Sequence, residues 1–273
     1  MQKPGIIIIF VKLYSNNMKY DLTFNVISNE RPAAGFALLR LQRADGEALP
    51  PMHPGQFVEV EVPRSKRTFL RRPISVNFVE PDGMTLWLLV REAGEGTAAL
   101  CTLEPGSSLR LMLPLGNGFG VDASHRTLLV GGGVGVAPLL YLARLISEAG
   151  NRPTVLLGAR SAEMLLQACE FEKYADVLIA TDDGSAGHHG VVTTHPAMVS
   201  GEFDRICCCG PAPMMKAVAA VARQRGIDCE VSLENMMACG LGACLCCVEN
   251  TVKGHVCVCT EGPVFNINQL NWQ

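Results

Sequence analysis

The hydrophobic pattern divides the chain into two parts. In the first part, short apolar or alternating runs are separated by glycine and proline, and helical periodicity is weak except at Thr97–Thr102. Short strands and turns at this spacing predict a small antiparallel β-barrel over residues 18–122. The predicted strands are Phe36–Leu41, Phe57–Val62, Leu86–Val90 and Leu109–Leu113.

After residue 122, strands alternate with helices. One helix is expected from the glycine-rich turn at Gly131–Gly135 to about Ala149, and two more over Ala162–Tyr174 and Pro213–Arg225. This alternation predicts a parallel, Rossmann-like sheet with helices on both faces over residues 123–228. The predicted strands are Leu128–Val130, Thr154–Leu157, Val177–Ala180 and Ile206–Cys209.

The two ends of the chain differ from these parts. A last predicted strand, Cys229–Leu233, leads into a segment rich in cysteine and glycine, so residues 229–273 are expected to form a small third module. Residues 1–17 are interpreted as an N-terminal extension or a misplaced start, because strand-like sequence begins at Met18. The expected fold class is therefore mixed β and α/β.

Composition narrows the possible functions. The 273 residues are 48% hydrophobic, which is enough to bury the cores of two domains and a small module. A formal net charge of −3 gives no electrostatic reason to expect nucleic acid as a partner. Twelve cysteines that cluster in so long a chain indicate a reducing cytoplasm rather than a secreted disulfide scaffold. The run Ile6–Val11 weakly resembles a signal peptide, and nothing else approaches a membrane span.

The segment Cys239–Cys259 holds six of the twelve cysteines. Cys239, Cys244 and Cys247 have the spacing C-x4-C-x2-C, and a distant cysteine follows. This is the plant-type spacing of thiolates around a [2Fe–2S] cluster, and small residues between the first two cysteines let the loop point its amides at sulfur. A zinc site, a disulfide knot and buried apolar cysteines are alternatives, but zinc sites commonly use two C-x2-C pairs. The spacing favours the cluster.

Two stretches of the predicted barrel suit an anionic nucleotide. Arg72 and Ser75 flank Pro73 and Ile74 as a cation and a hydroxyl that can hold a phosphate. Gly94–Thr97 lies at a strand-to-helix junction, where free amides and the positive helix end favour an anion. Each stretch alone is more commonly a strand end or a turn, but the two together favour a bound nucleotide.

The predicted parallel sheet carries three further candidates at strand ends. Glycines at Gly131–Gly135 let the backbone approach a diphosphate, although the run is not a clean G-x-G-x-x-G. A carboxylate at Asp182 would accept from ribose hydroxyls and repel a 2′-phosphate, which favours NAD over NADP; a solvated turn is an equal alternative. Cys209 is placed to lie against a nicotinamide, although buried strand cysteines are common for packing alone.

The order of these stretches resembles the ferredoxin–NAD(P) reductase superfamily. Arg-Pro-Ile-Ser is followed by Gly-x-Gly-Thr, then by Gly-Gly-Gly-Val-Gly-x-Ala-Pro and Cys-Gly-Pro. The cysteine-rich tail, which ends in Glu-Gly-Pro-Val-Phe, is similar to the electron-transfer subunits of class 1B dihydroorotate dehydrogenases, and the resemblance runs from about Met18 to the end. The N-terminal extension and the surplus cysteines are the departures.

The resemblance implies three cofactor sites and no catalytic side chain. FAD would contact Arg72, Pro73, Ile74, Ser75, Leu89, Val90, Arg91, Gly96 and Thr97. NAD would contact Gly131, Gly132, Gly133, Gly135, Asp182, Cys209, Gly210 and Pro211. Four cysteines hold the cluster in that family, the last just before the Gly-Pro-Val-Phe run. The ligands implied here are Cys239, Cys244, Cys247 and Cys259, with Cys246 and Cys257 as extra thiols nearby.

The resemblance also implies a partner and a reaction. In the family an FMN-carrying catalytic subunit oxidises dihydroorotate to orotate for pyrimidine biosynthesis, in an expected heterotetramer with two copies of each subunit. Electrons pass through [2Fe–2S] to FAD and then as hydride to NAD⁺. One alternative is the small FAD and [2Fe–2S] subunit of an NAD(P)H-dependent ferredoxin or sulfide oxidoreductase. An alternative of another class is a non-redox regulatory protein that binds a nucleotide and zinc.

Overall fold

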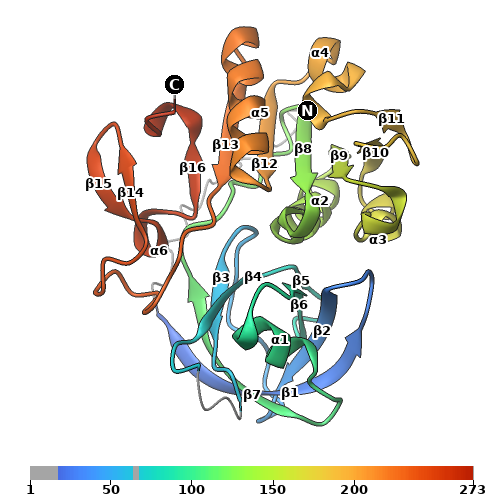
Figure 1. The fold of residues 1–273 in the computed structure, drawn as a ribbon. Coiled ribbons are helices and arrows are strands. Elements are labelled where there is room, and N and C mark those ends of the chain that lie inside the picture. Colours follow the sequence, from blue (N-terminus) through green and yellow to red (C-terminus); the bar gives the residue numbers. More distant parts are fainter. Residues whose placement is uncertain (1–17, 64–67, 273) are drawn as a thin grey trace, which may run out of the picture.

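The computed structural model describes residues 18–63 and 68–272. The predicted extension, residues 1–17, lies outside the described residues. Two large sheets and a small hairpin make up the fold, and the strands of the first sheet all come before those of the second in the chain. Figure 1 shows the two sheets one above the other, with the small hairpin near the C-terminus beside the upper sheet.

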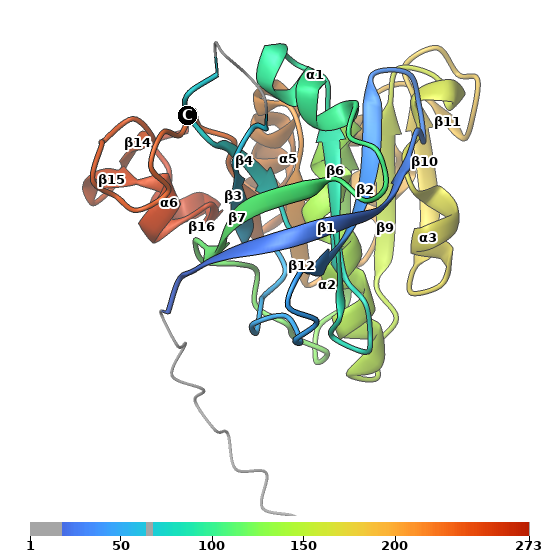
Figure 2. The same cartoon turned by 90° about the horizontal axis from the view of Figure 1, so that it is seen from below.

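The first sheet has seven antiparallel strands in the order β4-β3-β7-β1-β2-β6-β5. It curls around an apolar core, which confirms the antiparallel architecture expected for the first part of the chain. Seen from below, β1 and β7 run side by side across the curl (Figure 2). The elements are β1(Tyr20–Glu30), β2(Phe36–Arg43), β3(Phe57–Val60), β4(Arg72–Ser75), β5(Phe78–Val79), β6(Thr85–Arg91), α1(Glu95–Cys101) and β7(Ser108–Leu115).

The second sheet has the order β11-β10-β9-β8-β12-β13-β16, and every pair except β13–β16 is parallel. The chain steps outward from β8 on one side and from β12 on the other, so the strand order reverses between these two strands. Open parallel sheets bind ligands at the carboxyl ends of the strands on either side of such a reversal. The strands are β8(Thr127–Gly132), β9(Thr154–Ala159), β10(Asp176–Thr181), β11(His188–His189), β12(Arg205–Cys209), β13(Asp228–Ser232) and β16(Val264–Asn266).

Helices cover both faces of this sheet, as predicted. Side chains of α2 pack with Cys207 and Cys209 of β12, whereas those of α5 pack with Cys208 between them. Because successive strand residues point to opposite faces, the two helices lie on opposite sides of the sheet. The helical elements are η1(Gly133–Val136), α2(Ala137–Glu148), η2(Ala162–Met164), α3(Ala168–Glu172), η3(Val192–Thr194), α4(Pro196–Ser200) and α5(Ala212–Arg225).

The single helix predicted over Ala162–Tyr174 is wrong. The structure has a short 3-10 turn, η2, and the short helix α3, separated by an extended Leu165 and by Gln167 in the left-handed region at φ 56°. Leu166 between them is buried. Apolar spacing alone predicted continuity, but the backbone leaves the helical conformation at this point.

The C-terminal segment is interleaved with the second sheet. Strand β16 pairs antiparallel with β13, so the chain returns to the sheet after the cysteine-rich segment. The remaining elements are β14(Val248–Thr251), β15(Gly254–Cys257), α6(Val258–Glu261) and η4(Ile267–Gln269). The predicted domain boundaries after residues 17, 122 and 228 stay predictions; residue 122 lies between β7 and β8.

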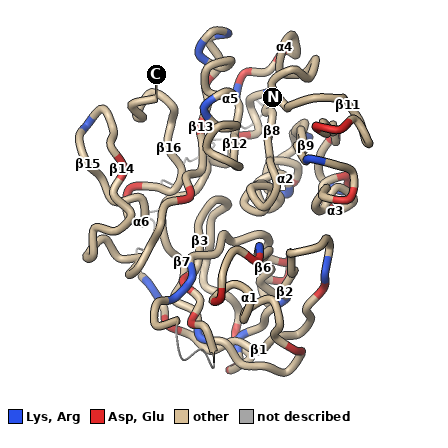
Figure 3. The backbone as a smooth tube through the Cα atoms, viewed as in Figure 1, with Lys and Arg blue, Asp and Glu red and all other residues tan. Residues whose placement is uncertain are grey.

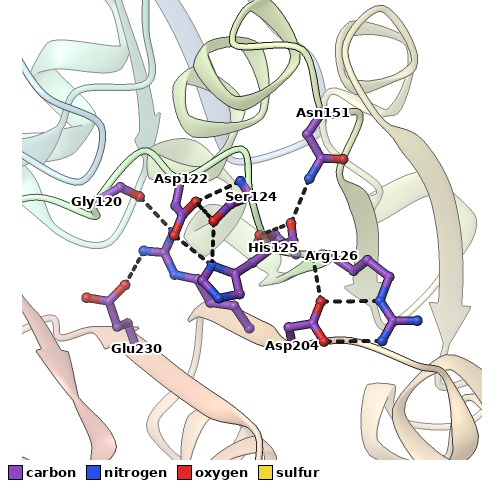
Figure 4. Close-up of polar contacts among 10 residues, drawn as sticks. Gly120, Asp122, Ser124, His125, Arg126, Asn151, Asp204 and Glu230 are labelled. Atoms are coloured by element: carbon purple, nitrogen blue, oxygen red, sulfur yellow. Dashed lines mark hydrogen bonds and ion pairs between the residues drawn. The ribbon is translucent and has the colours of Figure 1, made fainter. Parts of the chain in front are cut away.

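A polar network holds the connection between the two large sheets (Figure 4). The buried Arg205 of β12 donates from Nη1 to the Gly120 carbonyl at 2.8 Å and pairs through Nη2 with Glu230 of β13. Nearby, the hydroxyl and backbone N–H of Ser124 and the ring of His125 hold the pKa of Asp122 at about 2. The connection is therefore tied to the amino-terminal edge of the parallel sheet, away from the β8 and β12 carboxyl ends.

Charged residues of both signs are interspersed over both sheets (Figure 3). Among the described residues, no helix is both long and apolar enough to cross a membrane.

Arg205→Met tests the connection. It leaves the Gly120 carbonyl and the Glu230 carboxylate without their cationic partner, so we expect the free energy of unfolding to fall by about 1–3 kcal/mol. Urea unfolding, followed by circular dichroism, measures this free energy. Arg126→Met is the control, because Arg126 makes solvent-exposed ion pairs and should cost less than about 1 kcal/mol. Equal losses in the two variants would contradict a structural role for Arg205.

Candidate functional site

The two stretches proposed to hold a phosphate in the barrel come together. Arg72 begins β4, and Gly96 lies in the first turn of α1. A Cβ at Gly96 would lie 2.6 Å from the Arg72 Nε, so the guanidinium packs directly over this glycine. The Thr97 hydroxyl accepts from the backbone N–H groups of Ala93 and Gly94, which fixes the loop before the helix. The guanidinium of Arg72 and the first turn of α1 are therefore in direct contact.

A cavity of about 190 Å³ lies beside this pair, between the barrel, the parallel sheet and the cysteine-rich segment. Of the residues predicted to hold FAD, it is lined by Pro73, Ile74, Ser75, Leu89, Arg91 and Thr97. Val90 points the other way, into the barrel core, where it is fully buried. The parallel sheet contributes Gly135 and Cys209 to the same cavity. Residues proposed to bind two different cofactors thus line the same cavity.

The glycine-rich turn and the Cys209–Pro211 stretch are in contact at the ends of β8 and β12. A Cβ at Gly135 would lie 2.4 Å from the Cys209 carbonyl oxygen, and one at Gly132 would lie 2.5 Å from the Met214 Sδ. Only glycine allows backbones to approach this closely. Burial raises the pKa of the Cys209 thiol to about 12, so this group is neutral near pH 7.

A second cavity, of about 620 Å³, adjoins the first, and Arg91 and Val134 line both. Gly132, Gly133 and Pro211 line it, together with Asp182 at the end of β10. The carboxylate of the neighbouring Asp183 accepts hydrogen bonds from the hydroxyl and the N–H of Ser185. These bonds lower the pKa of Asp183 and hold its side chain within the turn. Asp182 is therefore the carboxylate of this pair that faces the cavity.

The cysteine-rich segment directs backbone N–H groups at sulfur. The Leu241 N–H donates to Cys239 Sγ at 3.3 Å, and the Gly242 N–H donates to Cys259 Sγ at 3.1 Å. Desolvation raises the pKa of Cys239, but donors from Leu241, Cys244 and Ala243 outweigh it and lower the pKa to about 6. These donors favour the thiolate form of Cys239, the form that binds iron.

The structure distinguishes the two candidates for the fourth cysteine. Cys259 is buried, accepts an N–H bond at its sulfur and donates its own N–H to Cys247 Sγ at 3.4 Å. Cys257 instead directs its thiol at the Gly242 carbonyl, 3.9 Å away. A metal-bound thiolate accepts hydrogen bonds and is repelled by a carbonyl, so these contacts favour Cys259.

Over residues 18–63 and 68–272, no three His, Cys, Asp or Glu side chains form a ready mononuclear metal site. A two-iron cluster sets a different requirement, because each iron takes two protein thiolates and only pairs of sulfurs need converge. Cys247 and Cys259 are linked by the contact above, and Cys244 contributes a hydrogen bond to Cys239. The donor set fits a [2Fe–2S] cluster, and the assignment of these four cysteines stays a proposal.

The cysteine-rich segment also contributes to the first cavity. Met237, just before Cys239, and Pro263, shortly after Cys259, both line it. The Gly262 carbonyl accepts from the Asn117 N–H, which ties this end of the segment to the residues that follow β7. Sequence reasoning missed both residues. Pro263 belongs to the Gly-Pro-Val-Phe run, but nothing in the local sequence predicts that it lines this cavity.

A buried carboxyl lies where the segment meets the barrel. Glu59 of β3 is fully buried, and a Cβ at Gly240 would lie 2.9 Å from its Cγ. Burial raises the pKa of Glu59 to about 7, while the positive charge of Arg71 acts in the opposite direction. Glu59 lies inside a strand and matches no motif, so the sequence alone does not predict its burial.

Comparison with known proteins agrees with this geometry. A family described as the iron-sulfur cluster binding domain of dihydroorotate dehydrogenase B matches residues 234–271, and the oxidoreductase NAD-binding domain matches residues 129–220. A "Dihydroorotate dehydrogenase B (NAD(+)), electron transfer subunit" from Caldanaerobacter subterraneus is 37% identical over 252 residues, covering 91% of this chain and 97% of the relative. One from Shouchella clausii is 39% identical over 83% of this chain and 90% of the relative.

The chain belongs to the family of dihydroorotate dehydrogenase B electron transfer subunits. It is therefore an oxidoreductase component rather than a regulatory zinc protein. Among solved structures, the NADH-dependent reduced ferredoxin-NADP oxidoreductase is similar, with a TM-score of 0.81 at 30% identity over 91% of this chain and 90% of the other. The FAD/NAD-binding domain of a Vibrio cholerae nitric oxide dioxygenase, with a TM-score of 0.68 at 22% identity over 77% of this chain and 98% of the other, shares the fold.

Gly135→Ala tests the contact between the glycine-rich turn and Cys209. The added Cβ would push the turn away from the backbone carbonyl, so we expect the dissociation constant for NADH to rise at least about tenfold, or about 1.4 kcal/mol. Isothermal titration measures it. Gly226→Ala is the control: it has a positive φ of 66° but open space around it, far from the cavity. It should cost about 1 kcal/mol of stability and leave NADH binding unchanged. Normal NADH binding by the Gly135 variant would contradict this role of the turn.

Proposed function

We propose that this chain is the electron transfer subunit of an NAD⁺-dependent dihydroorotate dehydrogenase. It would bind FAD, NAD and a [2Fe–2S] cluster, and work with an FMN-containing catalytic subunit in a heterotetramer with two copies of each. The observation that carries the proposal is the shared first cavity, which is lined by Ser75 of the barrel, Cys209 of the parallel sheet, and Met237 and Pro263 of the cysteine-rich segment. One small space is therefore open to all three parts of the chain.

Each part contributes something distinct to the proposed electron transfer. The cofactors supply the redox chemistry: the cluster carries single electrons, and the flavin converts them to a hydride for NAD⁺. Arg72 and the backbone at Gly96 would hold the FAD diphosphate. Pro73, Ile74 and Leu89 give the first cavity its apolar wall, and the neutral thiol of Cys209 closes it on the side of the sheet. None of these groups has to move a proton on dihydroorotate.

The second cavity suits the nucleotide. The diphosphate would lie at the turn formed by Gly132 and Gly133, where backbone amides and the start of α2 favour an anion. The carboxylate of Asp182 would accept from ribose hydroxyls and repel a 2′-phosphate, which favours NAD over NADP.

The proposed cluster lies beside the flavin cavity because of how the chain is connected. Met237 and Pro263 line the cavity, and each is separated from a proposed ligand, Cys239 or Cys259, by only a few residues. Around the same segment, Leu241 and Leu245 are exposed apolar residues, as expected for a surface that docks a partner subunit.

Assay with the partner tests the function. The chain is co-purified anaerobically with an FMN-containing catalytic subunit of dihydroorotate dehydrogenase B, and dihydroorotate-dependent reduction of NAD⁺ is followed by absorbance. We expect a yellow-brown complex with the mass of two copies of each subunit and turnover that requires both. NAD⁺ reduction with ferredoxin or sulfide but not dihydroorotate would overturn the pyrimidine assignment and keep the cofactors. A colourless protein with stoichiometric zinc would end the electron-transfer proposal.

Cys259→Ser tests the fourth ligand. The Cys259 sulfur accepts the Gly242 N–H, and the Cys259 backbone N–H donates to the Cys247 Sγ, so the Cys259 thiolate lies beside another proposed ligand. We therefore expect this variant to lose or destabilise the cluster. Iron and acid-labile sulfide per chain, with the visible and electron paramagnetic resonance spectra, measure the loss. Cys257→Ser is the matched control and should keep the cluster. The opposite pattern would make Cys257 the ligand.

A further inference from the structure

An amide pair joins the barrel to the parallel-sheet domain. Asn77, just after β4, is fully buried. Its Nδ2 donates to the Gln167 Oε1 at 2.9 Å, and the Gln167 Nε2 donates back to the Asn77 Oδ1 at 2.8 Å. Two mutual hydrogen bonds between side chains fix both the distance and the mutual orientation of the amide planes.

The same Asn77 side chain also reaches the start of α2. Its Nδ2 makes a second hydrogen bond, of 3.0 Å, to the carbonyl of Ala137, which follows the glycine-rich turn and lines the first cavity. The Asn77 backbone N–H donates to Trp87 in the barrel at 3.1 Å. One buried residue thus connects the strand that carries Ser75 with the turn proposed to hold NAD.

The partner residue is held in an uncommon conformation. Gln167 has φ 56° and ψ 24°, in the left-handed backbone region that residues other than Gly, Asn and Asp rarely adopt. Its carbonyl still accepts from the N–H groups of Glu170 and Phe171 at the start of α3. Strained backbone of this kind persists where the surroundings over-determine it, and it gathers at functional sites. The double amide contact to Asn77 is one such constraint.

Among the residues that the structure describes, the other side-chain hydrogen bonds between the two domains lack this combination. The Tyr141 hydroxyl donates to the Met52 carbonyl at 3.4 Å, and Arg144 donates to the Val79 carbonyl. Neither bonds at once to the residue after the glycine-rich turn and to a second side chain. The amide pair is therefore the contact best placed to set the angle between the barrel and the turn.

We propose that Asn77 and Gln167 are positioning residues for hydride transfer, which hold the nicotinamide at reacting distance from the flavin. The inference rests on the proposed binding of FAD and NAD. In the transfer from NADH, one carbon–hydrogen bond of the nicotinamide would break and a bond from that hydrogen to the flavin would form with the same electron pair. NADH would be oxidised to NAD⁺ and the flavin reduced, so no further reactant is needed. Loss of the pair should slow this step, because a displacement of about 1 Å costs on the order of a hundredfold in rate.

Two variants and their combination test the pair in the holo-chain without its partner. Asn77→Ala removes one amide. Gln167→Gly removes the other while favouring the positive φ that Gln167 already has, so it should fold even if the Asn77 variant does not. Stopped-flow reduction of the flavin by NADH measures the transfer, and the long-wavelength charge-transfer absorbance reports contact between the two rings.

We expect each single variant to reduce the flavin about 10- to 100-fold more slowly and to lose charge-transfer absorbance. The dissociation constant for NADH should stay within about threefold, because the nucleotide contacts lie on the sheet side. The double variant should be within about twofold of the slower single variant, since the two amides act as one unit. Electron exchange between cluster and flavin should be unchanged. Tyr141→Phe is the control at the same interface and should keep the wild-type rate.

Several results would overturn the inference. A wild-type rate in Gln167→Gly would do so, as would fully additive losses in the double variant. A parallel loss of flavin content and of all electron-transfer steps would show a merely structural role. If the wild-type chain bound no FAD, or NADH did not reduce it, the proposed function itself would fall.

Discussion

The close approach of backbone to backbone at the ends of β8 and β12 is the constraint on which the sites depend. Gly135 lies so near the Cys209 carbonyl that no side chain fits between them, and the strand order of the sheet reverses at the same place. Gly135 and Cys209 line the first cavity, and Val134, just before Gly135, lines both cavities. The barrel supplies one side of the first cavity and the cysteine-rich segment another. The proposed cofactors would therefore meet at the carboxyl ends of the strands, where the strand order reverses.

Local chemistry explains what could be predicted from the sequence. The Arg-Pro-Ile-Ser strand, the glycine-rich turn and the cysteine spacing each encode their own geometry within a few residues, and the structure places each next to a cavity or within the thiolate loop. The alternation of strands and helices likewise follows from hydrophobic periodicity. The family membership adds the partner and reaction, which no side chain in this chain specifies.

Long-range contacts explain what could not be predicted. Asn77 and Gln167 are 90 positions apart, and nothing in either neighbourhood marks them as partners. The predicted helix over Ala162–Tyr174 fails at Gln167, where tertiary hydrogen bonds override local periodicity. The burial of Glu59 depends on Gly240, which reaches it from the far end of the chain. Such features arise only when separate segments pack.

The pairing of β13 with β16 makes the cysteine-rich segment a domain insertion. Ser232 lies opposite Val264 in the sheet, and the Leu233 N–H donates to the Pro263 carbonyl at 2.8 Å, so the chain leaves and re-enters at almost the same point. Topologically, residues 234–262 are an enlarged hairpin loop. Iron held between Cys239 and Cys259 would close this loop a second time, so binding of the proposed cluster would also restrain the sheet edge. The edge of the nucleotide-binding sheet and the loop that carries the proposed cluster ligands are thus one continuous structural unit.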